Sequence, residues 1–372
     1  MVQKRVMLFL IALLAVVALL TTACGGSGGS GADTGADAGK DSNKTYSLSI
    51  NVAYPPPVHE WESKYIAHEK FAQRVDEATN GQVKIDIYYN SQLTPTAQAL
   101  DALKRGVIDM QSSTSYWGGV VPEADVIWLP FWSKGHGHAM HVMRDTKIGE
   151  MIEESYAKQD AKLLFYWPVS IEGLITTKPI DSYDDMKGMK VRMGASSWPT
   201  WYKTMGVTPI NVEASEQYEA MMRGTMDATV YVLYSIDTYK FYEVAKHLTL
   251  PGFIDPFLCY VLVNQQSWDK LPADLQQAIE EVAAEIELES IAGSERLTDS
   301  ILDICAEKGV EVTKLNKQEF EKFKESAMPL WDEFAAKSDN CAEMVEILKA
   351  DLVEWEANNP EAKEWEERWL AQ

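Results

Sequence analysis

The sequence predicts an α/β protein with two lobes and one long helix that spans both of them. Segments with the period-two alternation of strands are separated by segments with helical spacing, as in βαβ units. The chain has 372 residues, of which 46% are apolar, which is enough for two hydrophobic cores. Residues 272–308 have helical spacing throughout. A helix of that length measures about 50 Å, which exceeds the width of one small lobe.

The N-terminal residues predict export rather than a folded element. Two basic residues precede a run of 15 apolar residues, whereas about 20 are needed to span a bilayer. The run leads to Cys24 and a Gly/Ser-rich segment, and it resembles the lipobox of bacterial lipoproteins, with Thr21 where an aliphatic residue is usual. This resemblance implies a signal peptide at 1–23, a lipid on Cys24 and a tether at 24–45, which places the folded part in the periplasm at the cell envelope. Simple secretion is the alternative.

The strands expected in the folded part are alternating or short apolar runs bounded by turn residues. They are residues 46–52, 83–88, 107–114, 162–168, 171–176, 189–193 and 226–232. Helices are expected over 61–75, 94–105 and 272–308. Because strands and helices alternate, each lobe is expected to hold a mostly parallel sheet covered by helices.

Charge and cysteine content narrow the possible partners. The net charge of −22 repels phosphate backbones, so nucleic acid is excluded as a partner. Beyond Cys24, the cysteines Cys259, Cys305 and Cys341 show no metal-ligand spacing. We expect them to be buried thiols, and one disulfide with an odd thiol is the alternative.

Five segments of the chain, in order, carry a resemblance to a known family. They are Phe71–Ile85, Ala102–Met110, Asp185–Arg192, Glu216–Ala228 and Lys240–Leu250. The most specific is Asp185–Arg192, which reads DMKGMKVR and is similar to the family's DLKGLKIR. Together the segments resemble the extracytoplasmic solute-binding proteins of TRAP transporters, the DctP family, over about residues 46–330.

This resemblance implies a two-lobed clamshell like that of periplasmic binding proteins. It implies a monomeric receptor, not an enzyme, that uses no cofactor, closes over a small organic acid and delivers it to membrane permease subunits. The expected division is lobe I at 46–170 plus 233–285, lobe II at 171–232 plus 286–335, and a helical extension at 336–372. The expected hinges are residues 169–171 and 229–232.

The resemblance also implies a ligand contact for Arg192. In the family, the Arg that ends this segment forms a bidentate pair with the ligand carboxylate. The chemistry agrees, because a planar guanidinium fits a carboxylate and stays charged in a dry cleft. The alternative for Arg192 is an ordinary surface ion pair.

Two departures from the family pattern indicate the kind of acid. Many members carry a second Arg where this chain has Glu172, and "QEN" where this chain has Thr229-Val230-Tyr231. An acidic and an aromatic side chain at these positions argue against a second carboxylate on the ligand. They favour a monocarboxylate with an apolar or aromatic body.

Aromatic side chains are the candidate walls of the cleft. Trp167 and Tyr231 lie at or beside family ligand positions, and Trp117 lies in a Gly-containing loop after a strand. The remaining candidates are Tyr54, Tyr116, Trp198, Tyr234 and Phe257.

Two other function classes remain open at this point. One is a solute-binding protein for an ABC transporter or a sensor kinase. The other is a periplasmic hydrolase or metalloprotein that uses Glu172 or the cluster His136, His138 and His141. No HExxH, GxSxG, Walker or GxGxxG motif supports enzymatic chemistry.

Overall fold

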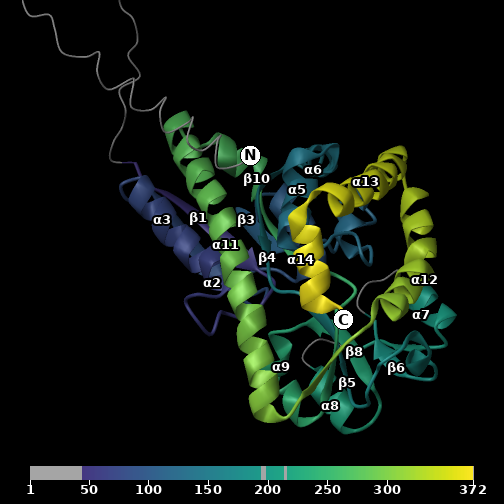
Figure 1. The fold of residues 1–372 in the computed structure, drawn as a ribbon. Coiled ribbons are helices and arrows are strands. Elements are labelled where there is room, and N and C mark those ends of the chain that lie inside the picture. The colour runs from purple at the N-terminus through teal and green to yellow at the C-terminus, as the bar shows by residue number, and fades with distance from the viewer. Residues whose placement is uncertain (1–43, 194–197, 213–215, 372) are drawn as a thin grey trace, which may run out of the picture. The chain divides into compact units, whose positions relative to one another are not determined.

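The computed structural model describes residues 44–193, 198–212 and 216–371. The expected signal peptide, Cys24 and most of the tether lie outside these residues. None of the helices in the described ranges is long and apolar enough to cross a membrane. The described residues form two sheets, each with its own helices, joined by short crossings and one long helix (Figure 1).

The first sheet has the strand order β2-β1-β3-β10-β4. Its strands are β1 (Tyr46–Val52), β2 (Val83–Tyr88), β3 (Met110–Ser113), β4 (Ala161–Pro168) and β10 (Leu258–Asn264). The helical segments α2 (Ser63–Tyr65), η1 (Ile66–Lys70) and α3 (Phe71–Ala78) follow one another without a break. The other helices beside this sheet are α4 (Thr96–Lys104), η2 (Pro122–Trp128), α5 (Gly135–Asp145), α6 (Lys147–Ala157) and α10 (Gln265–Asp269).

The second sheet has the strand order β11-β9-β5-β8-β6-β7. Its strands are β5 (Glu172–Thr176), β6 (Lys190–Arg192), β7 (Thr208–Ile210), β8 (Ala228–Val232), β9 (His247–Leu250) and β11 (Glu311–Lys314). The helices that accompany it are η3 (Tyr183–Met186), α7 (Trp198–Thr204), α8 (Gln217–Met222), α9 (Ser235–Thr238) and η5 (Phe241–Glu243). The α/β class expected from the alternating pattern is therefore confirmed.

Both sheets are mostly parallel, as expected, and each contains one strand that runs in the opposite direction, β10 in the first sheet and β5 in the second. In the first sheet β1 pairs in parallel with β2 and β3, but β10 pairs antiparallel with β3 and β4. In the second sheet β5 is antiparallel to both β8 and β9. The reason is connectivity, because β5 and β10 each enter their sheet from the other lobe instead of through a βαβ crossover.

Two short segments cross between the sheets. Residues 169–171 connect β4 to β5, as expected, and residues 251–257 connect β9 to β10. The expected hinge at 229–232 is wrong, because these residues form β8 inside the second sheet. The expected lobe boundary at residue 233 is also too early. The chain stays in the second sheet through β9 and returns to the first sheet only with β10.

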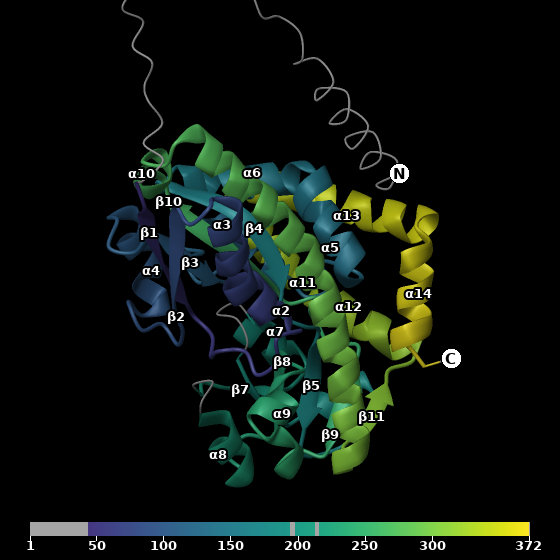
Figure 2. The same cartoon turned by 90° about the vertical axis from the view of Figure 1, so that its left-hand side faces the viewer.

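The long helix α11 (Ala273–Lys308) has 36 residues and runs past both sheets. It packs on β4 and α3 of the first sheet and on α9 and β11 of the second (Figure 2). Apolar side chains at helical intervals, such as Leu275, Ile279 and Ile286, are buried along it. Gly309 ends it in the left-handed conformation, with φ of 67°.

The C-terminal helices leave the second lobe and return to it. Helix α12 (Lys317–Ala335) packs on α7, and α13 (Asp339–Asn358) packs on α5 and α6. Helix α14 (Pro360–Trp369) then runs back toward the second lobe (Figure 1), where Arg368 pairs with Asp299 of α11 at 2.7 Å and Ala371 N donates to Leu315 O, just after β11, at 3.0 Å. This segment therefore contacts both lobes.

Candidate functional site

Arg192 is the last residue of β6, a strand that runs parallel to both of its neighbours. Its side chain therefore lies at the carboxyl edge of parallel strands, where open α/β sheets bind ligands. The Nε atom donates to Val212 O at 3.1 Å, and the guanidinium carbon lies 5.2 Å from the centre of the Tyr231 ring. No carboxylate among the described residues forms an ion pair with Arg192. Its neighbours therefore orient the guanidinium without supplying a counter-charge from the described residues.

Glu172, the first residue of β5, places a buried carboxyl group near this guanidinium. Only 3% of the residue is exposed, and Oε2 has no hydrogen-bond partner. Burial raises the pKa of Glu172 to about 8, although the charge of Arg192 lowers it. At neutral pH the carboxyl group is therefore mostly protonated and can donate a hydrogen bond.

Two tyrosines of the second lobe surround the same groups. The Tyr231 ring, on β8, is half-buried and lies under the Arg192 guanidinium. The Tyr202 hydroxyl, on α7, is buried without a hydrogen-bond partner. Burial raises the pKa of Tyr202 well above its usual value. The charge of Glu172 raises this pKa further, and the charge of Arg192 lowers it. Because both charges act on the Tyr202 hydroxyl, the three groups lie close together.

Two tyrosines of the first lobe complete the group. Tyr54 follows β1, and its hydroxyl accepts from Thr114 N and from the Cys259 thiol, both at 3.2 Å. Burial, Cys259 and Glu172 raise the pKa of Tyr116 to about 12, and Arg192 opposes them. Yet 50% of Tyr116 is exposed, so its ring is enclosed by protein on one side and open to solvent on the other.

We call Arg192, Glu172, Tyr231, Tyr202, Tyr54 and Tyr116 the Arg192 site. Five of the candidates expected from the sequence lie in it, namely Arg192, Glu172, Tyr231, Tyr54 and Tyr116. A sixth candidate, Tyr234, is buried beside it, with the Lys64 Nζ atom 4.6 Å from the centre of its ring.

The three tryptophan candidates were expected to line the cleft, but their side chains are buried within the protein. Trp167 is fully buried beneath Tyr54, and its indole N–H donates to Ser112 Oγ at 3.1 Å. The Trp117 N–H donates to Thr96 O, and the ring packs edge-on against Tyr156 inside the first lobe. Ligand contact by these two residues stays a prediction.

Trp198 contributes to the contact between the lobes. It is fully buried at the start of α7, and its N–H donates to Trp128 O at 3.1 Å. The half-buried Trp128 ring packs against Tyr116 and against the candidate Phe257. Sequence reasoning missed both Trp128 and Tyr202, because neither lies in a motif and only the fold brings them to Tyr116 and Arg192.

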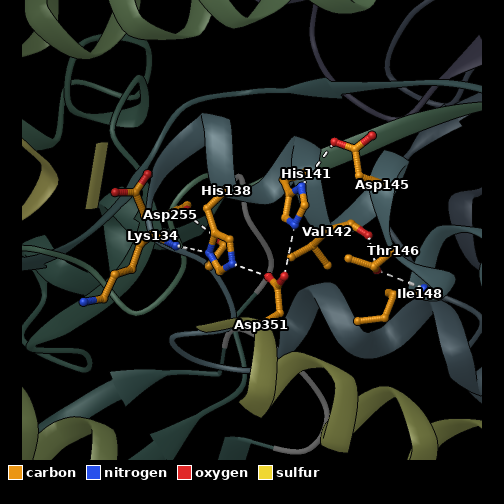
Figure 3. A network of polar contacts seen from close by, with 10 residues as sticks. Lys134, His138, His141, Val142, Asp145, Thr146, Ile148, Asp255 and Asp351 are labelled. Carbon is orange, nitrogen blue, oxygen red and sulfur yellow. Dashed lines mark hydrogen bonds and ion pairs between the residues drawn. The ribbon is translucent and has the colours of Figure 1, made fainter. Parts of the chain in front are cut away.

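The histidine cluster attaches the C-terminal helices to α5. His138 Nε2 lies 2.7 Å from Asp351 Oδ2, and His141 Nε2 lies 3.0 Å from Asp351 Oδ1 (Figure 3). His136 is bonded instead to Ser294 Oγ at 2.7 Å. Within the described ranges, no three His, Cys, Asp or Glu side chains converge on a point that could hold a metal ion. The thiols of Cys259, Cys305 and Cys341 are buried and free.

The Arg192 site is built to hold an organic anion. Its described residues offer a guanidinium that has no ionic partner among them, a protonated carboxyl group and several aromatic rings from both lobes. The nearby Cys259 thiol is a poor nucleophile, because burial raises its pKa.

Comparison with known families agrees with this chemistry. The model of the family described as "Bacterial extracellular solute-binding protein, family 7" (DctP) matches residues 58–338, which end before α13. The match covers the second sheet, all strands of the first sheet except β1, and every residue of the Arg192 site except Tyr54.

Two curated proteins are similar over most of their length. A C4-dicarboxylate-binding periplasmic protein of Rhodobacter capsulatus is 28% identical over 290 residues, which cover 77% of this chain and 86% of that protein. A 2,3-diketo-L-gulonate-binding periplasmic protein of Escherichia coli is 28% identical over 267 residues, or 70% of this chain and 80% of that protein.

A solved structure shows the same fold. It is a TRAP periplasmic solute-binding protein from Desulfovibrio salexigens with bound orotic acid, 25% identical, with a TM-score of 0.75. The similarity covers 83% of this chain and 99% of that one. The two-lobed fold expected from the sequence is thereby confirmed.

Proposed function

Because the chain belongs to the bacterial extracellular solute-binding proteins of family 7, which are receptors and not enzymes, we propose that it binds a small monocarboxylic acid through Arg192. The lobes close over the acid, and the receptor delivers it to the membrane subunits of a TRAP transporter. In this proposal the receptor is a monomer that Cys24 anchors to the cell envelope.

The observation that carries this proposal is the guanidinium of Arg192, which forms no ion pair with any residue that the structure describes. Arg144 differs from Arg192 in this respect, because it forms ion pairs with Glu153 and Glu287. A half-buried cation without an anionic partner is costly unless a ligand supplies the anion. The related proteins from Rhodobacter capsulatus, Escherichia coli and Desulfovibrio salexigens all bind acids according to their descriptions.

Glu172 and Tyr231 support the narrower choice of a monocarboxylate. A second carboxylate near Glu172 would face a group that donates only while protonated and repels once ionised. The ring of Tyr231 lies beside Arg192 and offers an apolar face to the ligand body. Acids with an aromatic or branched body therefore fit better than small dicarboxylates such as succinate.

The test is the substitution Arg192→Lys, measured by calorimetric titration with the acid that binds tightest in a screen. Lysine keeps the charge but loses the planar fork and the Nε–H bond to Val212. We expect the affinity to fall about 30-fold, which is about 2 kcal/mol.

Arg223→Lys is the matched control. Arg223 is exposed on the end of α8 and pairs with Glu219 on its own helix. We expect this variant to bind the acid like the wild type. An Arg192→Lys protein with normal affinity would show that the carboxylate is held elsewhere.

A further inference from the structure

A second cavity lies behind the two crossings, on the side covered by the C-terminal helices. Its volume is about 430 Å³, and α14, α11 and the first residues of α5 line it. Its walls also include Ile171 and Asp255, one from each crossing between the sheets. We call this space the hinge cavity. Its size falls in the range of small-molecule sites, about 300–1,000 Å³.

Asp255 gives this cavity an unsatisfied buried acceptor. The residue is 5% exposed; its Oδ2 accepts from the Trp365 N–H at 2.5 Å, but its Oδ1 has no partner. Burial raises the pKa of Asp255 to about 6, Trp365 and Arg368 lower it, and Glu295 raises it. These three residues all line the cavity, so the carboxylate faces it.

The basic side chains of the cavity are already paired. Lys134 Nζ lies 2.7 Å from Glu356 and 3.3 Å from Glu366, and Arg368 pairs with Asp299 at 2.7 Å. Burial lowers the pKa of His136 to about 4, so its imidazole is neutral at pH 7.

The acidic side chains are not paired. Glu295, Glu361 and Glu364 line the cavity and form no ion pair with another described residue. Together with Asp255 they leave an excess of negative charge around a space that Trp365 and Trp369 partly enclose. Carboxylates beside indole rings suit a positively charged group on a carbon body.

We propose that the hinge cavity binds a small organic cation that carries an ammonium group, with Asp255 and Glu295 as its main partners. A metal ion is a poorer occupant, because the described residues hold no set of three donors that converge on one point. The acids are instead distributed around a cavity large enough for a molecule.

Binding here should also affect closure of the lobes, a consequence that rests on the proposed function. The occupant would touch Ile171 and Asp255, which lie on the two crossings that move when the lobes close. Any preference of the cation for the open or the closed form changes the acid affinity, and the acid changes the cation affinity by the same factor.

The experiment is a calorimetric titration of the purified protein with 1,4-diaminobutane. Butane-1,4-diol is the neutral control for the ligand, and magnesium chloride is the control for charge alone. We expect the diamine to bind and the two controls not to bind. Glu295→Gln should weaken the diamine about tenfold, the size of one charge-assisted bond.

Asp303→Asn is the matched control variant, since Asp303 is an exposed acid on α11 outside the cavity. It should leave the diamine affinity unchanged. Asp255→Asn should weaken the diamine at least as much as Glu295→Gln, and if this buried variant fails to fold, Glu295→Gln still decides the question.

The outcomes separate this site from the Arg192 site. No diamine binding, or an equal loss with Glu295→Gln and Asp303→Asn, would overturn the cation site while acid binding stays intact. Diamine binding that survives Arg192→Lys would support the cation site even if the acid proposal failed. An acid affinity that does not change at saturating diamine would overturn the coupling.

Discussion

The Arg192 site and the hinge cavity both contain acidic and basic side chains, but they differ in which charge has no ionic partner among the described residues. At the Arg192 site it is the cation, and burial keeps the neighbouring acid Glu172 mostly protonated. At the hinge cavity Lys134 and Arg368 are paired, while Asp255 Oδ1 has no partner. The sign of the charge left without a partner, and not the list of charged residues, therefore predicts the sign of the ligand.

The largest expected effect comes from removing the unpaired charge altogether. Arg192→Gln should weaken acid binding about 100-fold, or about 3 kcal/mol, because the ligand carboxylate loses its proposed ionic partner. The diamine affinity of the hinge cavity should stay unchanged, because the two sites use different residues. Titration of each variant with both ligands checks this, and a parallel loss of both affinities would contradict two independent sites.

The next effect is a dependence of acid binding on pH. The pKa of Glu172 is about 8 without ligand, and a bound carboxylate beside it raises that pKa further, so the complex holds the proton more tightly. Acid affinity should therefore fall about tenfold between pH 7 and pH 9. Calorimetry across this range should show the slope in the wild type.

Glu172→Gln is the matched variant, because glutamine keeps the shape and a donor but cannot ionise. It should bind the acid with an affinity that is flat from pH 7 to 9. A slope that persists in this variant would assign the titration to another group.

A smaller effect is expected where the C-terminal helices attach to the first lobe. Burial raises the pKa of the Asp351 carboxyl group, but the hydrogen bonds and charges of His138 and His141 outweigh burial and lower it. This pairing stabilises the fold above the usual pKa of aspartate and is lost as the pH falls below it. Asp351→Asn should reduce the free energy of unfolding by about 1 kcal/mol at pH 7.

Thermal unfolding measures this loss, which corresponds to a fall in Tm of about 2 °C. Glu354→Gln, an exposed change on the same helix α13, is the control and should leave Tm unchanged. Equal Tm values for Asp351→Asn and the wild type would show that the two histidines do not hold the helix.

The smallest signal is the change of shape on closure. Acid that binds both lobes should reduce the radius of gyration in small-angle scattering, because Tyr54 and Tyr116 come from the first lobe and Arg192 from the second. Arg192→Gln at the same acid concentration should keep the open value. An unchanged radius for wild type at saturating acid would argue for a rigid site.

Periodicity and family likeness predicted much of this fold. The helix expected over 272–308 is observed as Ala273–Lys308. Helical spacing that continues over so many residues is typical of a long helix and of no other regular structure. The crossing at 251–257 was missed, because it contains no motif and its position depends on β9 and β10 lying in different sheets. The mostly parallel direction of the strands was predicted, but the one antiparallel strand of each sheet, β10 and β5, was not, because its direction depends on pairing partners far apart in sequence.

Prediction of the site from the sequence was limited in the same way, because the position of single side chains also depends on contacts between residues far apart in sequence. Arg192 was predicted as a ligand contact because it is the last residue of the family-like segment Asp185–Arg192. The structure places it at the end of strand β6. Tyr116 and Trp117 are neighbours in one loop, yet only Tyr116 lies at the Arg192 site, because the Trp117 N–H donates to Thr96 O inside the first lobe. The direction of each ring depends on packing partners that are distant in sequence, such as Thr96 for Trp117, so the local sequence pattern does not predict it.

The most direct test of the central claim is a thermal-shift measurement in which each monocarboxylic acid is compared with its amide and with its dicarboxylate. Benzoate, benzamide and phthalate form one such set, and further sets with branched bodies extend it. A monocarboxylate at 100 times its Kd should stabilise the protein by about 2.7 kcal/mol. The amide has no charge for Arg192, and the second carboxylate of the dicarboxylate meets no second cation among the described residues of the Arg192 site, so neither should stabilise it. A dicarboxylate or an amide that stabilises the protein as much as its monocarboxylate would contradict the claim that the unpaired Arg192 and the protonated Glu172 select the ligand.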